Sequence, residues 1–175
     1  MPNTYRIAED GSHVIGVFPD RTEFLIDVED YEKVKLYTWY KNIDGYAVTR
    51  RDGKTTRLHR LLMEVPDYLQ VDHINRNKCD NRRSNLRFAT NKENARNVGL
   101  QKNSSTGVKG VNYDARINKF RARIRVDGRL IHLGHFSNLI DASGAYDRAA
   151  LHYFGEFAFL NNLNVAMEVT TTPPP

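Results

Sequence analysis

The strict alternation of charged and apolar residues over 119–126 constrains the fold more than any other feature of the sequence. Because neighbouring side chains of a β-strand point to opposite faces, this pattern predicts a half-buried strand with one cationic face. The Asp127-Gly128 dipeptide that follows is typical of a two-residue hairpin turn. That turn would pair Arg123 with His132 in the returning strand. The cationic positions of the strand are Lys119, Arg121, Arg123 and Arg125, and its apolar positions are Phe120, Ala122, Ile124 and Val126.

The residues around this hairpin can supply the rest of a small sheet domain. Residues 108–113 can form a third strand, and residues 141–154 place small and aromatic side chains at helical spacing. Alanines at these positions would let a helix lie close against the apolar face of the sheet, and Gly155 is placed to end it. The other face would remain bare and basic. Such a face can enter a DNA groove, although an ordinary solvated sheet face has the same pattern.

The positive charge of the chain lies in its middle. The net charge is only +5, but residues 100–135 hold 8 basic and 2 acidic side chains, whereas residues 1–58 hold 9 and 10. No apolar stretch approaches the roughly 20 residues that a membrane-spanning helix needs, and the first residues lack the apolar middle of a secretion signal. Cys79 is the only cysteine, so no internal disulfide can form. We therefore expect an intracellular protein with no membrane partner.

The first part of the chain is expected to be rich in β-structure. Short β-like runs separated by turn residues occur at 13–18, 23–26, 45–49 and 57–62. Asp27 could cap a short helix that runs to Tyr37 and packs inward through Val34. The near-zero net charge of this part favours a supporting role over direct contact with DNA.

A carboxylate and an imidazole stand side by side at Asp72 and His73, at the end of a short apolar strand. Since neighbouring strand residues face opposite ways, both can reach one site only where the strand ends or bends. The polar stretch 75–84 supplies such a loop, and a second strand-like run begins at Asn85.

A short helix is expected directly after the second strand. Thr90 and Glu93 have the spacing of a capping box, which would begin a helix after Thr90 and put Asn94 in its first turns. Twelve residues separate His73 from Asn85 and nine separate Asn85 from Asn94, so a strand, loop, strand and helix would gather these polar side chains. Taken alone, each has an ordinary structural role, such as a surface salt bridge, a turn or a helix cap.

Over residues 58–97, this pattern resembles the HNH endonucleases of the ββα-metal fold. His73 falls on the first histidine of the family motif, Asn85 on the middle asparagine, and Asn94 on the last position, where many members carry asparagine. Asp72 matches the carboxylate that often precedes the first histidine. The cysteine pairs that hold a structural zinc in other members are absent, so no structural zinc is expected.

The resemblance implies hydrolysis of phosphodiester bonds. His73 would act as the general base, a role that suits an imidazole at neutral pH. Asp72 and Asn94 would bind one Mg²⁺ or Mn²⁺ ion per active site, and Asn85 would hold the loop and orient His73. This interpretation requires that Asp72 and Asn94 share an ion and that the His73 ring reaches solvent. Candidates for clamping the scissile phosphate are Arg60, Arg82, Arg83 and Arg87, and His59 is expected in a core or backbone-contact role.

The C-terminal part resembles the APETALA-two or ethylene-response-factor DNA-binding domain, which is also found fused to HNH nucleases. The likeness is carried by the segments 107–111, 120–124, 133–136 and 145–150, and it runs to about residue 161. Members dock a three-stranded sheet in the major groove, which implies DNA contacts by Lys109, Arg121, Arg123, Arg125 and His132. His132 and Arg123 depart from the residues common in plant members, so the target sequence of those members should not be transferred.

We therefore expect an α+β protein in which a β-rich N-terminal part leads into a ββα-metal HNH core, followed by a three-stranded antiparallel sheet packed on one helix. The expected bounds are 1–98 for the first region, 99–106 for a linker, 107–162 for the DNA-binding domain and 163–175 for a flexible tail. The expected function is a metal-dependent endonuclease of homing or phage type that cuts double-stranded DNA in a bacterial or phage-infected cell, with dimerisation left open. The alternative is a sequence-specific DNA-binding regulator with an inactive nuclease core.

Overall fold

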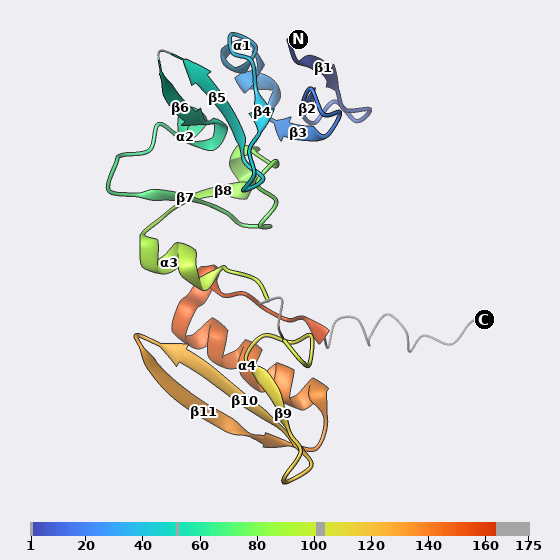
Figure 1. Cartoon of the computed structure of the whole chain (residues 1–175), viewed down its shortest axis with the longest axis vertical. Coiled ribbons are helices and arrows are strands. Elements are labelled where there is room, and N and C mark those ends of the chain that lie inside the picture. The colour runs from blue at the N-terminus through green and yellow to red at the C-terminus, as the bar shows by residue number, and fades with distance from the viewer. Residues whose placement is uncertain (1, 52, 101–103, 164–175) are drawn as a thin grey trace, which may run out of the picture. The chain divides into compact units, whose positions relative to one another are not determined.

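The computed structural model describes residues 2–51, 53–100 and 104–163, and it confirms the α+β fold class (Figure 1). The chain divides into two compact units, unit 1 over Met1–Asn94 and unit 2 over Ala95–Pro175. The linker and tail predicted from the sequence lie partly outside the described residues, so their bounds stay predictions. None of the described helices is long and apolar enough to cross a membrane.

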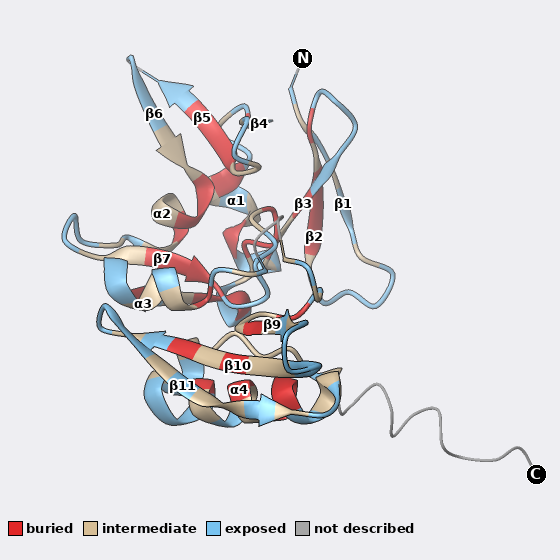
Figure 2. Ribbon diagram, turned by 60° about the horizontal axis from the view of Figure 1, so that its bottom comes forward, coloured by how far each residue is buried: buried red, intermediate tan, exposed pale blue. Residues whose placement is uncertain are grey.

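Unit 1 begins with a three-stranded antiparallel sheet. Its strands are β1 (Thr4–Ile7), β2 (Val14–Val17) and β3 (Glu23–Ile26), in the order β1-β2-β3. The alternation of β3 buries Phe24 and Ile26, which pack with Val34 and Trp39 in the core of this unit (Figure 2). The indole N–H of Trp39 donates to the carbonyl oxygen of Val34 at 2.9 Å, so the buried ring leaves no polar group unsatisfied.

A short helical segment after β3 is tied to a distant loop. It comprises the 3₁₀ helix η1 (Val28–Asp30) and the helix α1 (Tyr31–Val34), and it ends before the predicted limit at Tyr37. Asp27 stands at the N-cap position, as predicted, but its side chain makes no cap hydrogen bond, because its carboxylate accepts one from the backbone N of Arg83 at 2.7 Å. That contact spans 56 residues, which local spacing cannot anticipate.

The second sheet of unit 1 ends where a helix replaces a predicted strand. The sheet contains β4 (Tyr40–Lys41), β5 (Ala47–Arg51) and β6 (Lys54–Arg57), and helix α2 (Leu58–Met63) follows directly. The strand predicted over 57–62 is therefore wrong. Leu58 and Leu62 lie about one helical turn apart and are both buried. The apolar positions Leu58, Leu61 and Leu62 have the i, i+3, i+4 spacing of one helix face, which the strand prediction overlooked.

Two strands and a helix follow, as predicted. Strands β7 (Gln70–His73) and β8 (Leu86–Ala89) pair antiparallel, and α3 (Asn91–Arg96) begins after Thr90. The capping box is confirmed. The backbone N of Thr90 donates to the carboxylate of Glu93 at 2.8 Å, and the backbone N of Glu93 donates to the hydroxyl of Thr90 at 3.2 Å.

The loop between β7 and β8 is anchored to the first sheet. It contains the 3₁₀ helix η2 (Arg83–Asn85). The backbone N of Leu25 in β3 donates to the carbonyl of Cys79, and the backbone N of Asn81 donates to the carbonyl of Leu25, both at 2.8 Å. The first sheet of unit 1 therefore helps to fix the loop that follows His73.

Unit 2 is a three-stranded antiparallel sheet packed on one helix, as predicted. Strands β9 (Val111–Asp114), β10 (Lys119–Val126) and β11 (Arg129–Phe136) lie in the order β11-β10-β9, and α4 (Leu139–Phe154) is followed by η3 (Gly155–Phe157). Arg123 pairs with His132, as the hairpin turn predicts. The apolar face of β10 packs on the small residues of α4, with Ala122 and Ala142 both buried (Figure 2).

A bulge in β11 changes which side chains share the basic face. The strand carries one extra residue, Leu133, between the partners of Ala122 and Arg123. Because strand side chains alternate, this extra residue puts His135 on the same face as His132, and their ring centroids are 4.6 Å apart. In a regular strand the two histidines would face opposite ways, so the sequence pattern did not indicate His135.

Gly110 is required where the chain enters β9, and its replacement provides a test of the packing in unit 2. Its φ is +76°, and a Cβ atom there would lie 2.1 Å from the ring of Tyr146 and 2.7 Å from the carbonyl oxygen of Arg123. We expect Gly110→Ala to lower the free energy of unfolding of unit 2 by about 3 kcal/mol, measured by urea denaturation of the full chain.

Gly107→Ala is the matched control, because Gly107 has a φ of +69° but no atom within 4 Å of the added Cβ. Backbone strain alone should cost about 1 kcal/mol there. Equal losses for the two variants would contradict the close approach of α4 to the entry of β9.

Candidate active site

His73 lies at the end of β7 in a buried polar environment. It is only 5% exposed, and its Nε2 lies 3.4 Å from the Oδ1 of Asn81. The rings of His59 and Tyr46 pack around it, with centroid distances of 5.0 and 6.0 Å. This burial differs from the open ring that the sequence interpretation requires.

Burial also sets the protonation state of the imidazole. It lowers the pKa of His73, although the hydrogen bond with Asn81 and the negative charge of Asp72 act in the opposite direction. The ring is therefore neutral at pH 7, which is the form that can accept a proton. Asn81 is fully buried and was not singled out from the sequence, because the polar stretch 75–84 has no periodicity that would indicate which side chain faces inward.

Asp72 is paired with the residue directly across the sheet. Its Oδ2 accepts hydrogen bonds from the Nε and Nη2 of Arg87 at 2.8 and 2.5 Å. The side chains of Asp72 and Arg87 are only 6% and 12% exposed. The guanidinium of Arg87 therefore compensates a buried carboxylate, and the DNA contact predicted for Arg87 stays a prediction.

Asn85 closes the loop between β7 and β8. Its Oδ1 accepts a hydrogen bond from the backbone N of Asn75 at 2.9 Å, and its Nδ2 donates to the carbonyl of Asp80 at 2.8 Å. These are the contacts that a loop-holding role requires. The amide oxygen that lies 3.4 Å from the Nε2 of His73 belongs to Asn81, and the orienting role predicted for Asn85 stays a prediction.

The two predicted metal ligands come from different elements. Asp72 lies on β7, and Asn94 lies on α3, where its backbone N bonds the carbonyl of Thr90 at 3.0 Å. Carboxylate and amide oxygens are donors that Mg²⁺ and Mn²⁺ prefer, so these residues fit a hard divalent cation. Among the residues with described positions, no group of three or more His, Cys, Asp or Glu side chains gathers to hold a metal. Water and phosphate oxygens would therefore have to complete the coordination of an ion held by Asp72 and Asn94.

Three arginines that the sequence offered as phosphate clamps bind partners within the protein. Arg82 binds the buried carboxylate of Asp80 at 2.8 Å. Arg83 binds the buried carboxylate of Asp30 at 2.7 Å. Arg60 donates to two backbone carbonyl groups. These contacts hold loops and helices in place. Other basic side chains of unit 1 are therefore better candidates for binding a phosphate.

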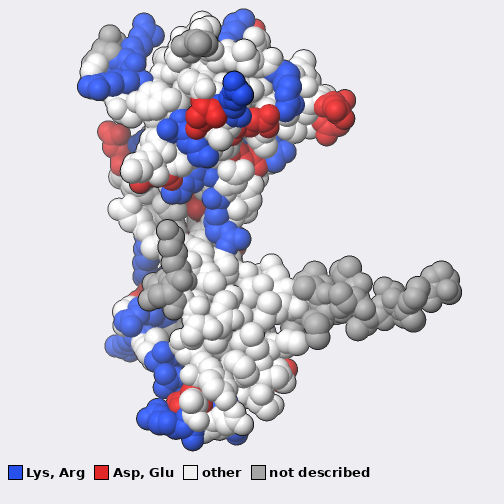
Figure 3. All heavy atoms as spheres, turned by 45° about the vertical axis from the view of Figure 1, so that its right-hand side comes forward, with Lys and Arg blue, Asp and Glu red and all other residues white. Residues whose placement is uncertain are grey.

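The DNA contacts predicted for unit 2 mostly lie on one face of its sheet. Arg121, Arg123 and Arg125 alternate along β10, and His132 lies opposite Arg123 on β11. Figure 3 shows basic side chains along one edge of this unit. The Nη2 of Arg123 donates to the Oδ1 of Asn112 at 3.3 Å, a weak contact that a nucleic acid could replace. The DNA contacts of the three arginines and of His132 stay predictions.

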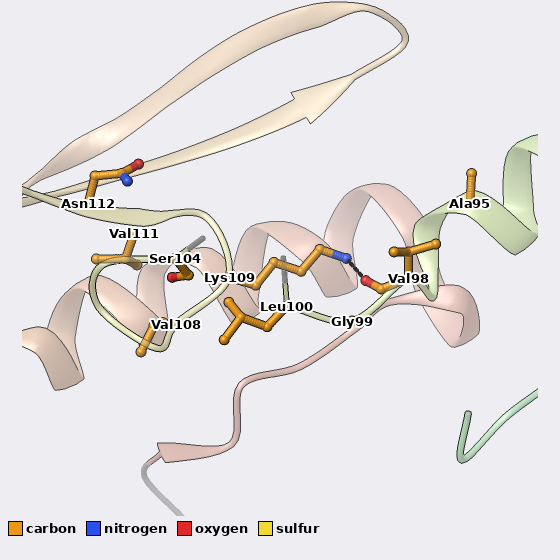
Figure 4. A pocket seen from close by; sticks show the side chains of 9 residues that line it. All are labelled: Ala95, Val98, Gly99, Leu100, Ser104, Val108, Lys109, Val111 and Asn112. Atoms are coloured by element: carbon orange, nitrogen blue, oxygen red, sulfur yellow. Dashed lines mark hydrogen bonds between the residues drawn. The ribbon is translucent and has the colours of Figure 1, made fainter. Parts of the chain in front are cut away.

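Lys109, the remaining predicted contact, turns inward in unit 2. It lines a pocket of about 410 Å³ beside β9, where its ammonium donates to the carbonyl of Val98 (Figure 4). It also donates to the carbonyl of Arg96 at 3.1 Å and lies 4.9 Å from the ring centroid of Phe159. Contact with DNA would require Lys109 to give up these interactions.

The buried ion pair between Asp72 and Arg87 should be costly to break. Arg87→Ala leaves a buried carboxylate without its cation, so we expect the free energy of unfolding to fall by about 3 kcal/mol in urea denaturation at pH 7. The double variant Asp72→Asn with Arg87→Ala should recover most of that loss, because no buried charge remains. If the double variant is as unstable as the single one, the ion pair is not the source of the stability.

His59 provides a prediction for the pH dependence of stability. It is buried, and burial, followed by the charge of His73, lowers its pKa from 6.5 to about 3. The unfolded chain therefore binds a proton between these pH values that the folded chain does not, so stability falls as the pH drops below about 6.5. Between pH 6 and 4, His59→Phe should remove up to about 1.4 kcal/mol per pH unit of that dependence in urea denaturation. Parallel pH profiles for parent and variant would contradict the assignment.

Comparisons with known proteins agree with the geometry of unit 1. The family model described as HNH endonuclease matches residues 59–96. An uncharacterized HNH endonuclease of Acanthamoeba polyphaga mimivirus is 31% identical over 145 residues, which cover 79% of this chain and 74% of that protein. Protein 3.8 of Escherichia phage T7 is 27% identical over 94 residues, which cover 54% of this chain and 77% of that protein. No solved structure matches, and none of the matches points to an ethylene-response-factor domain. The strand, loop, strand and capped helix around His73, together with the extent of the mimivirus match, show that this chain belongs to the HNH endonuclease family.

Proposed function

We propose that this chain is a metal-dependent endonuclease that hydrolyses phosphodiester bonds of double-stranded DNA. The observation that carries the proposal is the ββα arrangement, with Asp72 and His73 at the end of β7 and Asn94 on the capped helix α3. Membership of the HNH endonuclease family supports nuclease activity.

His73 accepts the proton of the attacking water in this proposal. Its lowered pKa keeps the ring neutral at pH 7. The Oδ1 of Asn81 near Nε2 favours the tautomer that carries the proton on Nε2, which leaves Nδ1 as the accepting nitrogen. Because catalytic contacts often tighten only when substrate binds, the buried ring does not by itself exclude this role.

Asp72 and Asn94 would hold the divalent cation, Mg²⁺ or Mn²⁺. HNH endonucleases generally depend on a metal ion, which, when bound, stabilises negative charge on the phosphate and on the leaving oxygen. Ligating carboxylates are usually oriented by a further hydrogen-bond partner, so the contact of Arg87 with Asp72 is compatible with metal binding. Asn85 would hold the loop in the shape that presents these groups.

The sheet of unit 2 would read the target DNA, in the manner of an ethylene-response-factor domain. Arg121, Arg123, Arg125 and His132 supply cations and a donor on one face, and the bulge adds His135 to it. Phosphate contacts of this kind would make binding strongly dependent on salt. Of the two expected types, homing or phage, the mimivirus and phage relatives support the phage type, which would act inside a bacterial or phage-infected cell.

A DNA-binding regulator with an inactive nuclease core is the second candidate. The observations that favour it are the burial of His73 and the pairing of Asp72 with Arg87, which close both groups to substrate in this conformation. Cleavage by the parent protein separates the two candidates.

A plasmid-nicking assay tests the proposed activity. We expect the parent to nick plasmid DNA with Mg²⁺ or Mn²⁺, and His73→Ala to lower the rate by at least about a hundredfold because the general base is lost. Asp72→Ala and Asn94→Ala should also raise the metal concentration needed for half-maximal rate. Leu36→Ser, at a side chain that is 73% exposed, is the matched control and should retain activity. DNA binding without cleavage in either metal would favour the regulator, whereas double-strand breaks would indicate two acting chains.

A further inference from the structure

The N-terminal part has a net charge near zero, but its basic side chains are concentrated in one segment. Residues 47–60 carry five basic side chains and one acidic side chain, whereas residues 1–46 carry five and nine. The basic side chains of this segment are Arg50, Arg51, Lys54, Arg57 and Arg60. A separation of this kind creates a local positive potential that the total charge of the region does not indicate.

Four of these cations lie on the hairpin formed by β5 and β6, whereas Arg60 lies on the following helix α2. Arg51 pairs across the hairpin with Lys54, and Arg50 pairs with Thr55. All four paired side chains are exposed, and Figure 3 shows basic side chains gathered at the free end of this hairpin. Within the described chain, no hydrogen bond or ion pair involves the side chains of Arg50 or Lys54. Their charges are therefore available to an outside partner.

The other end of the hairpin leads to the candidate active site. The guanidinium carbon of Arg57, the last residue of β6, lies 4.8 Å from the ring centroid of Tyr46. The Nζ of Lys78 lies 4.4 Å from the same centroid and donates to the carbonyl of Asp44 at 2.8 Å. The Tyr46 ring in turn packs against His73, with 6.0 Å between centroids. Two cations are thus held one aromatic ring away from the proposed general base.

A groove runs along the same part of unit 1. It has a volume of about 380 Å³, and its lining consists of Asn42, Val48, Thr55, Thr56, Arg57 and Arg60. The lining holds two hydroxyl groups, an amide and two arginines, of which Arg60 already donates to two backbone carbonyl groups, and none of these six residues is acidic. This chemistry suits a phosphodiester backbone, which accepts hydrogen bonds and carries negative charge.

We infer that Arg50, Arg51, Lys54, Arg57 and Lys78 form a basic track that binds the phosphate backbone of DNA and leads it to His73. The inference rests on the proposed function. It assigns DNA contacts to unit 1, in addition to those proposed for the sheet of unit 2. A membrane surface is a poorer partner, because the described residues at the free end of the hairpin include no apolar side chain that could anchor it. Arg57 and Lys78 act as positioning residues for the phosphate next to His73.

The salt dependence of DNA binding tests the outer part of the track. The full chain is titrated into a fluorescein-labelled DNA duplex at several KCl concentrations, and the slope of log affinity against log salt is compared between variants. Each phosphate contact that is lost reduces the slope by about 1. The double variant Arg50→Gln with Lys54→Gln should therefore reduce the slope by about 2 and weaken binding at every salt concentration.

A control of equal charge separates the track from a general loss of positive charge. Arg21→Gln with Lys35→Gln removes two cations from other exposed positions of unit 1 and should leave the slope nearly unchanged. Both double variants should keep the thermal midpoint of the parent, since all four side chains are at the surface. Equal slopes for the two double variants would overturn the track.

Single-turnover cleavage at saturating DNA tests the inner part. Arg57→Gln and Lys78→Gln should each lower the cleavage rate even when all DNA is bound, and Arg57→Lys and Lys78→Arg should restore most of it. Loss of rate without rescue by the conservative variants would overturn the positioning role.

The track and the proposed activity can fail separately. If the parent cuts DNA while the hairpin variant binds like its control, the track alone is wrong. If binding depends on the hairpin but no metal supports cleavage, the track stands and the nuclease proposal fails.

Discussion

The closure of the loop between β7 and β8 by Asn85 is the constraint on which the candidate site depends. Its amide bonds the backbone at both sides of the loop, and the backbone of β3 bonds the same loop through Leu25. A strand end can present Asp72 and His73 to one place only if the following chain turns sharply and stays there. The N-terminal sheet therefore contributes to the site without supplying any of the motif residues. Loss of the Asn85 amide would remove a hydrogen bond from the carbonyl of the buried Asp80, which is costly in a small core.

Burial gives the site its chemical character. His73 is neutral at pH 7 because burial lowers its pKa, and the buried Asp72 has the guanidinium of Arg87 directly across the sheet. Neither condition could be met on an open surface, where water would screen the ion pair and hydrate the imidazole. The same burial closes the candidate site in this conformation, so the proposed transfer of a proton from water to His73 would require the site to open or change shape.

Cations in the two units have different roles according to their partners. Arg82 binds the buried carboxylate of Asp80 within the loop, and Arg83 joins the loop to η1 through the buried carboxylate of Asp30. Arg50 and Lys54 are exposed on a hairpin, and Arg121 and Arg123 lie along β10. A count of basic residues cannot separate these groups, because the distinction depends on which acidic side chain the fold brings within reach.

The sequence by itself determined the elements that follow from local periodicity and capping. Strict alternation predicted β10, the Asp127-Gly128 turn predicted its pairing with β11, and the capping box of Thr90 and Glu93 predicted α3. Tertiary structure decided the rest, because each remaining feature depends on contacts between residues far apart in the chain. Leu58 and Leu62 lie in a helix because both face a core built by other segments. The carboxylate of Asp27 bonds the backbone N of Arg83 and not its own helix. The fold of the loop, and no local pattern, places Asn81 next to the His73 ring. The polar residues of the motif could be named from their spacing alone, but their burial and their ion pairs arise only when the sheets and the loop pack together.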